Sequence, residues 1–386
     1  MSKAGHRIQS PEASYAGGEG VIRLFEPQGA SDMPNAIGYA ATAADSGMGA
    51  FHFERRALRP DDVRIDILYC GVCHSDLHQA RNDWGGTLYP CCPGHEIVGR
   101  VAAVGPEVRK FREGDLAAVG CLVDSCMSCD QCLKGEEQLC RKRATGTYNG
   151  KDRVTGETTY GGYSDHIVVR EAFVLRIPDG LDITRAAPLL CAGITTYSPL
   201  RKWSAGPGTR LGVAGLGGLG HMAVKLGAAM GCDVTVITGS PSKEADALTL
   251  GAHRVLLSSD REAMKAAANS FDLIIDTIPV AHRLQPYLPL LDIDGSLVIV
   301  GAIDEIPPFH SGLLLGGRRR VSGSPIGGIA ETQEMLDFCA AHGVLPECET
   351  IPIQDINHAY ERMETSDVKY RFVIDMASLS AERKAA

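Results

Sequence analysis

The feature that most constrains the fold is a glycine-rich turn between an apolar run and an amphipathic stretch, RLGVAGLGGLGHMAVKLGAA. The pattern predicts a strand, a turn with the spacing G-x-G-x-x-G, and then a helix, which is the context that makes this spacing meaningful. In such a turn the backbone approaches a pyrophosphate that lies at the helix N-terminus. We therefore predict a dinucleotide site at Gly215, Gly217, Gly218, Leu219 and Gly220. The alternative is a glycine-rich turn without a ligand.

The chain around this turn alternates between strand and helix patterns. Between about Ala192 and Gly328, strands such as DVTVIT, FDLIIDT and GSLVIVG alternate with helical stretches such as SKEADALTLG. This pattern predicts β-α-β units and a parallel sheet. Ligands of such sheets bind beyond the carboxyl ends of the strands. Thr277 and Gly301 follow two of the strands, so we expect both to line the cofactor groove.

The rest of the chain has a different pattern. From AIGYAAT to about Val169, short apolar runs alternate with Gly, Pro and Asp turns, which predicts a β-rich barrel. After Ile329, two helical stretches and the strand KYRFVID return to this barrel. We therefore predict an α/β chain with a discontinuous barrel domain (36–191 and 329–386) around a dinucleotide-binding domain (192–328). Residues 1–35 are expected to be a loose extension, and Met33 is an alternative start.

The residues after the second strand of the dinucleotide-binding domain indicate which dinucleotide binds. An NAD site places Asp or Glu about 20 residues beyond the turn, against the ribose 2′-hydroxyl. The strand CDVTVIT ends instead at Thr238, and Asp233 lies at its other end. Ser240 can hydrogen-bond a 2′-phosphate and Lys243 can neutralise one, although Lys243 can equally be a solvated lysine. We therefore predict NADP(H) rather than NAD.

Composition excludes several classes of protein. The 386 residues are too many for one ordinary core, which indicates two domains. A net charge of −9 argues against nucleic acid or an anionic membrane as partner. The N-terminus has no apolar run typical of a signal peptide, and the most apolar window contains charges and many glycines, so we expect a cytoplasmic protein without a membrane span. In that compartment, 13 cysteines indicate thiolates and metal rather than disulfides.

Four of these cysteines are closely spaced in CMSCDQCLKGEEQLC. The spacing C-x2-C-x2-C-x7-C lets four thiolates surround one tetrahedral zinc ion and leaves no coordination position for a substrate. We therefore predict a structural zinc site at Cys126, Cys129, Cys132 and Cys140. An iron–sulfur cluster also takes four cysteines and is the main alternative. Four unrelated core thiols are a further alternative.

A second set of polar residues lies in three separate segments. YCGVCHSDLHQ contains Cys73, PCCPGHEIVG contains His95 and Glu96, and APLLCAGITTY contains Cys191. Two thiolates and one imidazole would leave a fourth zinc position for water or a substrate oxygen. Spacing alone cannot join residues so far apart, and a lone buried Cys or His is usually an ordinary core residue.

Together these motifs resemble the zinc-dependent medium-chain alcohol dehydrogenases. The similarity spans about Ala36 to Met376, and CGVCHSDLH, YPCCPGHEIVG, LLCAGITTYSPL, GLGGLGH and DVKYRFVID resemble the cinnamyl alcohol dehydrogenase group, especially its bacterial broad-range aldehyde reductases. The resemblance implies a GroES-like barrel, a Rossmann domain, and an active cleft between them. It implies two zinc ions per chain, a small aldehyde or alcohol as substrate, and a homodimer.

The resemblance also implies roles for individual residues. Cys73, His95 and Cys191 would be the ligands of a catalytic zinc, which Glu96 approaches in relatives when the site is open, and Asp76 would orient His95. The resemblance also assigns the proton relay to Ser75 and His78, the nicotinamide contact to Thr195 and a pyrophosphate contact to Arg371. We expect Trp84 and Cys121 to form the pocket walls in this chain. Trp84 can equally be ordinary packing. Plant relatives carry an aromatic residue shortly after the fourth structural cysteine, where this chain has Thr145, so a general aldehyde range fits better than lignin chemistry.

Two other functions fit parts of the sequence. One is a zinc-free NADPH quinone reductase on the same fold, which the inventory of metal-binding side chains disfavours. The other is a non-catalytic zinc or redox scaffold, which would not need Ser75, His78 or Thr195. The basic run at 318–320 is expected to be a solvated or interface strand rather than a phosphate site.

Overall fold

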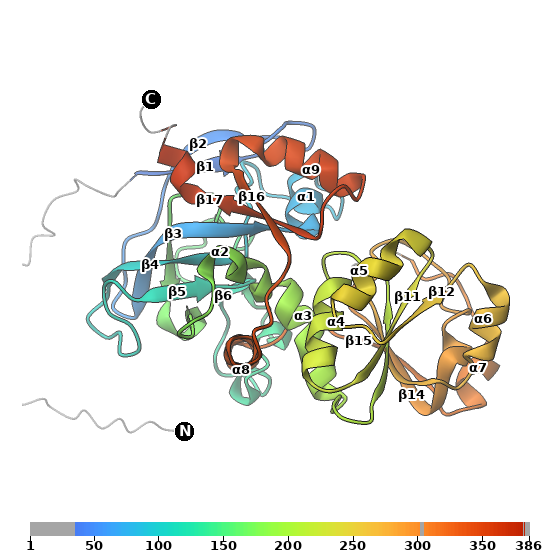
Figure 1. The fold of residues 1–386 in the computed structure, drawn as a ribbon. Coiled ribbons are helices and arrows are strands. Elements are labelled where there is room, and N and C mark those ends of the chain that lie inside the picture. The colour runs from blue at the N-terminus through green and yellow to red at the C-terminus, as the bar shows by residue number, and fades with distance from the viewer. Residues whose placement is uncertain (1–34, 302–304, 381, 383–386) are drawn as a thin grey trace, which may run out of the picture. The chain divides into compact units, whose positions relative to one another are not determined.

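The computed structural model describes residues 35–301, 305–380 and 382. The predicted parallel sheet is present and has six strands (Figure 1). Its order in space is β12 (Arg254–Leu257), β11 (Asp233–Thr238), β10 (Arg210–Ala214), β13 (Phe271–Asp276), β14 (Leu291–Ile299) and β15 (Arg320–Gly323). The order reverses direction beside β10, so the carboxyl end of β10 lies at the switch point where such sheets bind ligands.

The strands of this sheet are apolar because helices cover both faces. Val213 of β10 pairs with Val236 of β11 on one side and with Ile275 of β13 on the other, and all three are fully buried. Helix α4 (Gly220–Ala229) lies on one side of the sheet and α6 (Arg261–Ala266) on the opposite side (Figure 1). The short helix α5 (Glu244–Thr249) connects β11 to β12.

The second large sheet is the predicted barrel sheet and is mostly antiparallel. Its order is β16 (Cys348–Pro352), β17 (Arg371–Asp375), β3 (Asp62–Val72), β4 (Ile97–Val104), β5 (Leu116–Val119) and β9 (Leu175–Arg176), and β8 (His166–Arg170) also pairs with β3. Two small pairs complete the strands: β1 (Asn35–Ala40) with β2 (Gly49–Glu54), and β6 (Leu122–Asp124) with β7 (Thr145–Gly146). Because β17 pairs with β3, the last strand of the chain lies beside the strand that leads into Cys73.

The other helices connect or flank the sheets. They are α1 (His74–Ala80), α2 (Ile183–Ala186), α3 (Ala192–Lys202), α7 (Gly312–Leu315), α8 (Ile329–His342) and α9 (Ile356–Glu364). Single 3-10 turns occur at Cys132–Lys134, Glu137–Leu139, Glu171–Phe173, Ala187–Leu190, Pro241–Lys243, Leu288–Leu290, Ile353–Asp355 and Met376–Leu379. Helix α3 packs against α4 and α8, and one apolar cluster runs from Val98 and Ala118 of the barrel sheet to Leu211 of the parallel sheet.

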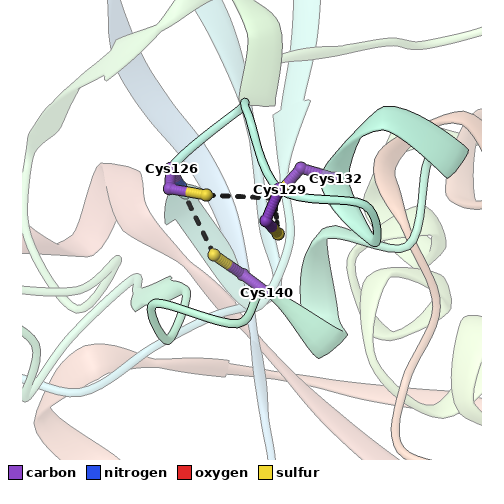
Figure 2. A group of neighbouring side chains, drawn as sticks. All are labelled: Cys126, Cys129, Cys132 and Cys140. Carbon is purple, nitrogen blue, oxygen red and sulfur yellow. Dashed lines mark hydrogen bonds between the residues drawn. The ribbon is translucent and has the colours of Figure 1, made fainter.

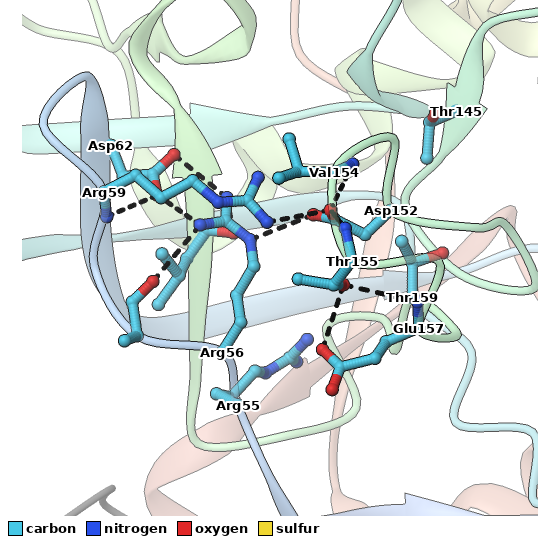
Figure 3. Close-up of polar contacts among 12 residues, drawn as sticks. Arg55, Arg56, Arg59, Asp62, Thr145, Asp152, Val154, Thr155, Glu157 and Thr159 are labelled. Atoms are coloured by element: carbon cyan, nitrogen blue, oxygen red, sulfur yellow. Dashed lines mark hydrogen bonds and ion pairs between the residues drawn. The ribbon is translucent and has the colours of Figure 1, made fainter.

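A network of ion pairs holds the 152–157 turn to the barrel (Figure 3). The Asp152 carboxylate accepts a hydrogen bond from Arg59 at 2.8 Å and lies 3.2 Å from Nε of Arg56. It also accepts the backbone N–H groups of Val154 and Thr155. Arg56 in turn pairs with the buried Asp62. Each charge has an opposite partner, so this cluster stabilises the turn.

Two further predictions concern the chain as a whole. The predicted loose extension at 1–35 and the alternative start at Met33 fall, except for residue 35, outside the described residues. None of the described helices has the length and apolar character that crossing a bilayer requires.

Candidate metal centre and dinucleotide site

The fold brings Cys73, His95, Glu96 and Cys191 together, although sequence spacing could not join them. One donor atom from each lies within 4.8 Å of the other three, and all four residues are buried. Cys73 follows β3 and precedes α1, and Cys191 precedes α3. His95 and Glu96 lie just before β4, which pairs with β3. The two sulfur atoms are 3.9 Å apart, close to the separation of about 3.8 Å that two thiolates have around a tetrahedral zinc.

Asp76 connects the segments that supply these donors. Its Oδ1 atom lies 2.9 Å from Nδ1 of His95 and accepts the backbone N–H of Gly94. Its Oδ2 atom accepts the backbone N–H of Cys73 and the hydroxyl of Tyr163. Since the Nδ1 side of His95 faces this carboxylate, the Nε2 atom is left to bind a metal. The orienting role of Asp76 stays a prediction, and this hydrogen bond is the contact that such a role requires.

The thiols of this cluster influence each other's protonation. The hydrogen bond with Cys191 lowers the pKa of Cys73 well below its usual range, and Arg371 and His95 add to this effect against the cost of burial. Contacts with Cys121 and Cys73 raise the pKa of Cys191. Cys73 is therefore poised as a thiolate, the form that binds zinc. Cys121, predicted as a pocket wall, lies beside Cys191 and contacts the carbonyl of Leu190 at 3.7 Å.

Glu96 is bound on one side only. Its Oε1 atom accepts a hydrogen bond from Nη2 of Arg371, and its Oε2 atom has no hydrogen-bond partner among the described residues. Burial raises the pKa of Glu96 to about 7, although Arg371 opposes the shift. The carboxylate lies against the backbone of Gly71. It fits there because Gly71 has no side chain, since a Cβ atom at this position would lie only 1.9 Å from Oε2. The oxygen that lies 4.0 Å from Nε2 of His95 is Oε1, so the Glu96 carboxylate stands between the imidazole and the guanidinium of Arg371.

The second cysteine group is a separate cluster in the loop after β6. Cys126, Cys129, Cys132 and Cys140 place their sulfur atoms within 4.8 Å of one another, and their side chains converge (Figure 2). The sulfur atoms of Cys129 and Cys132 are 3.5 Å apart, and those of Cys126 and Cys132 are 3.9 Å apart. Backbone N–H groups of Cys126 and Arg141 point at two of the sulfurs. Four sulfur donors around one point fit a closed tetrahedral site.

The glycine turn has the shape that a pyrophosphate requires. A Cβ atom on Gly217 would meet nothing within 4 Å, so this backbone is open to a ligand. A Cβ atom on Gly220 would lie 2.3 Å from the carbonyl oxygen of Gly215, so the turn itself needs glycine at that position. Gly215 has a φ of 91°, in the left-handed region that favours glycine. Gly218 faces Arg371, whose Cδ atom would lie 3.0 Å from an added Cβ.

Three other residues predicted for the cofactor site follow the strands β11, β13 and β14 directly or at one residue's distance. The Thr277 hydroxyl donates to the carbonyl of Ala214 at 2.8 Å, so it supports the turn from β13. Gly301 packs directly on the backbone of Ile278. The Ser240 hydroxyl lies 2.8 Å from that of Ser242. Other predicted residues are Leu219, which directly precedes α4, and Lys243, which donates to the Leu216 carbonyl at 2.8 Å.

The residues predicted for proton transfer, Trp84 of the predicted substrate pocket and Thr195 of the predicted nicotinamide contact lie on or near α1 and α3. Ser75 and His78 are three residues apart on α1 and therefore share a face of the helix. Nδ1 of His78 is 2.8 Å from the Asp83 carboxylate, and the His78 ring packs on Trp84, which is 48% exposed. Thr195 is buried one helical turn beyond Cys191, and its backbone N–H donates to the Cys191 carbonyl.

Sequence analysis missed several residues at the site. Tyr148 packs its ring 5.6 Å from that of His95 and is the aromatic residue that reaches the donor cluster after the four cysteines, whereas Thr145 lies in β7. Asp83, Tyr163 and Asp246 were also missed, although Asp83 lies five residues from His78 and Asp246 three from Lys243. In the sequence, Tyr148 is the aromatic residue of the segment RKRATGTY that follows the fourth cysteine. Only the fold shows that this residue of the segment lies beside His95.

The basic run at 318–320 has local partners. Arg318 pairs with Asp294, and Arg320 donates to the carbonyl of Asp294 and begins β15. Arg319 donates to the carbonyls of Leu291 and Leu313. Of the run, Arg320 lies in β15, whereas Arg318 and Arg319 lie in the turn before that strand, so the predicted strand begins at the last residue of the run.

The structure combines two sites. The parallel sheet carries a glycine turn of the kind that binds a dinucleotide, and the barrel sheet carries a buried cluster of two sulfurs, an imidazole and a carboxylate. This combination defines the class of metal-dependent oxidoreductases that use a dinucleotide. Comparison with known proteins makes the assignment specific. The family model for the alcohol dehydrogenase GroES-like domain matches residues 59–179, and the model for zinc-binding dehydrogenases matches residues 218–341. The chain belongs to the zinc-dependent alcohol dehydrogenase family and is an oxidoreductase.

Individual relatives are similar over almost their whole length. The NADP-dependent alcohol dehydrogenase C 1 of Mycolicibacterium smegmatis is 54% identical over 90% of this chain and 99% of its own. Among solved structures, a cinnamyl alcohol dehydrogenase of Sorghum bicolor has a TM-score of 0.86 and 46% identity, covering 89% of this chain and 98% of its own. A Helicobacter pylori CAD in complex with NADP(H) has a TM-score of 0.84 and 43% identity, with the same coverage.

Proposed function

We propose that this chain transfers hydride between NADP(H) and an aldehyde or primary alcohol, with broad-range aldehyde reduction that includes aromatic and cinnamyl aldehydes. The observation that carries the proposal is the position of Arg371. It binds Glu96 of the donor cluster and lies against Gly218 of the glycine turn, so the two sites are adjacent. The activities printed in the names of the relatives support the same conclusion.

The side chains present fit two zinc ions. Cys73, His95 and Cys191, with Glu96 in reach, would hold one of them. The separation of 3.9 Å between the two sulfur atoms and the convergence of the four donors support this assignment. The four other cysteines would hold the structural ion. When bound at the first site, zinc supplies Lewis acidity toward a carbonyl oxygen, and the reduced nicotinamide supplies the hydride.

The protein's own groups would prepare and complete this chemistry. Asp76 would hold the His95 ring at Nδ1, which leaves Nε2 for the metal. The Ser75 hydroxyl would deliver the proton that the product alcohol needs, and His78 would replace it from solvent, because both lie on one face of α1. Asp83 holds the His78 ring by Nδ1, which leaves Nε2 for proton exchange. Thr195 would contact the nicotinamide from the first turn of α3.

The preference for NADP(H) rests on the end of β11. Thr238 ends this strand, and Ser240, Ser242 and Lys243 follow, so the residues directly after β11 are not the Asp or Glu that holds the ribose 2′-hydroxyl in an NAD enzyme. Hydroxyls and an ammonium group instead suit a 2′-phosphate. The pocket beside them has a volume of about 300 Å³ and includes Leu216, Gly217 and Gly218.

The alternatives make different predictions for one assay. We expect purified protein to contain two zinc ions per chain and to oxidise NADPH much faster than NADH with benzaldehyde or cinnamaldehyde. One zinc with quinone turnover would instead support the quinone reductase, and metal without turnover would support a scaffold. Faster turnover with NADH would overturn the cofactor assignment.

Two finer proposals concern the state of the protein. We propose a homodimer, as the resemblance to the family implies, and size-exclusion chromatography with light scattering would test it. We also propose the cytoplasm as its compartment, because all 13 cysteines are free in the described chain, which suits a reducing environment.

A further inference from the structure

The pocket of about 300 Å³ beside the glycine turn is lined by two parts of the fold. Leu216, Gly218 and Lys243 come from the parallel-sheet side. Lys369 and Arg371 come from the C-terminal segment that enters β17 of the barrel sheet. A dinucleotide in this pocket would therefore meet both parts.

An ion pair crosses this pocket between the two parts. Nζ of Lys369 lies 2.8 Å from Oδ2 and 2.9 Å from Oδ1 of Asp246, a residue of α5. The hydroxyl of Tyr370 donates to Oδ2 of the same carboxylate at 3.2 Å. The Lys369 side chain is 72% exposed and that of Asp246 is 30% exposed. An exposed ion pair of this kind contributes little to stability, so its position over the pocket suggests another role.

Asp246 lies close to the residues predicted to bind the 2′-phosphate of NADP(H), so a bound phosphate would compete with its carboxylate for Lys369. It is three residues after Lys243, so the two share one face of the chain at the start of α5. Lys243 and Ser242 line the same pocket as Asp246. The titratable side chains that line the pocket are His74, Lys243, Asp246, Lys369, Tyr370 and Arg371. Asp246 is the carboxylate among them, and Arg371 already binds Glu96.

We propose that Lys369 is a second lysine of the 2′-phosphate site, supplied by the barrel part of the chain and held by Asp246 until the phosphate binds. This inference rests on the proposed NADP(H) dependence and deepens it. A 2′-phosphate near Ser242 and Lys243 brings about two negative charges beside Asp246. The flexible, exposed side chain of Lys369 then moves from the carboxylate to the phosphate, which is the stronger anion.

The consequence is a specific contribution to cofactor choice. NADH lacks the 2′-phosphate and leaves Lys369 on Asp246, whereas NADPH recruits it. Lys369 would therefore favour NADPH and add a contact between the cofactor and the C-terminal segment. A purely structural ion pair would affect both cofactors alike.

The test measures dissociation constants of NADPH and NADH by cofactor fluorescence, without substrate. For Lys369→Ala we expect the Kd of NADPH to rise about tenfold and that of NADH to change less than about twofold. A tenfold change corresponds to about 1.4 kcal/mol, close to the lower end of what a hydrogen bond to a charged group contributes. Lys369→Arg should restore most of the NADPH affinity. Asp246→Asn should lower the Kd of NADPH, because it frees Lys369 and removes a repelling charge. Lys265→Ala, on the exposed surface of α6, is the matched control.

Equal effects of Lys369→Ala on the two cofactors, or no effect on either, would overturn the proposal. Weaker NADPH binding in Asp246→Asn would also contradict it. These outcomes differ from a failure of the proposed cofactor preference itself. That failure would appear in the unmodified protein, as tighter binding of NADH than of NADPH.

Discussion

Nδ1 of His95 lies 2.9 Å from Oδ1 of Asp76, and both side chains are buried. Asp76 also accepts the backbone N–H groups of Cys73 and Gly94. One carboxylate therefore positions two of the proposed metal ligands at once. Such outer partners commonly change metal affinity by about 10- to 100-fold when they are lost.

Asp76→Asn should weaken zinc binding by about 10- to 100-fold, because the amide nitrogen cannot accept the hydrogen bonds that one oxygen now receives. Competition with a chelator, followed by zinc counting, measures this effect. Tyr163→Phe is the control, since it removes only the hydroxyl 3.3 Å from Asp76. If Asp76→Asn held zinc as tightly as the control, the orienting role would be wrong.

Cys191→Ala should reduce the zinc content from two ions per chain to one and abolish turnover, while the far-ultraviolet circular dichroism stays unchanged. The reason is that the second cluster, far from Cys191 in sequence, has its own four sulfur donors. Cys339→Ala is the matched control, because this buried thiol contacts Met335 and lies outside both clusters. Full activity in Cys191→Ala would show that Cys191 is not a ligand.

Gly217→Ala should leave the melting temperature of the cofactor-free protein unchanged, since an added Cβ meets nothing within 4 Å. It should raise the Kd of NADPH at least about tenfold, because a methyl group would keep a pyrophosphate from the backbone. Gly49→Ala, also in open space but in β2, should change neither quantity. Unaltered NADPH binding in Gly217→Ala would argue against the predicted cradle.

Asp152 should make the protein more stable at neutral than at acidic pH. Burial raises its pKa, but hydrogen bonds from Arg59 and from the N–H groups of Thr155 and Val154 outweigh this and hold the pKa of Asp152 well below its usual range. A lowered pKa in the folded state stabilises above the unfolded value of about 3.9, and this stabilisation disappears as the pH falls further.

Asp152→Asn should therefore lower the free energy of unfolding at pH 7 by about 1 kcal/mol, allowing for solvent screening, and the difference should shrink as the pH falls below about 4. Urea unfolding at a series of pH values measures this. Glu157→Gln is the control, since Glu157 accepts from the Thr155 hydroxyl rather than from an arginine. A difference that did not depend on pH would contradict the assigned ion pairs.

Local patterns predicted much of the fold. The glycine turn, the helix after it and the end of β11 at Thr238 appear as expected, because each depends on residues that are close in sequence. The four-cysteine group was predictable for the same reason, since its members lie within a loop of 15 residues, 126–140. The donor set with Cys73 and Cys191 was only inferable from the family resemblance, since 118 positions separate the two cysteines.

The sequence by itself determined the turn chemistry, the strand and helix periods and the cysteine spacing, because short-range sterics and ligand geometry act between near neighbours. Only the tertiary structure decided which distant residues meet: Arg371 with Glu96, Lys369 with Asp246, and Tyr148 with His95. These pairs depend on β17 returning beside β3 and on the packing around α3. Contacts of that kind are selected by burial of the whole core, and no short segment of the chain encodes them.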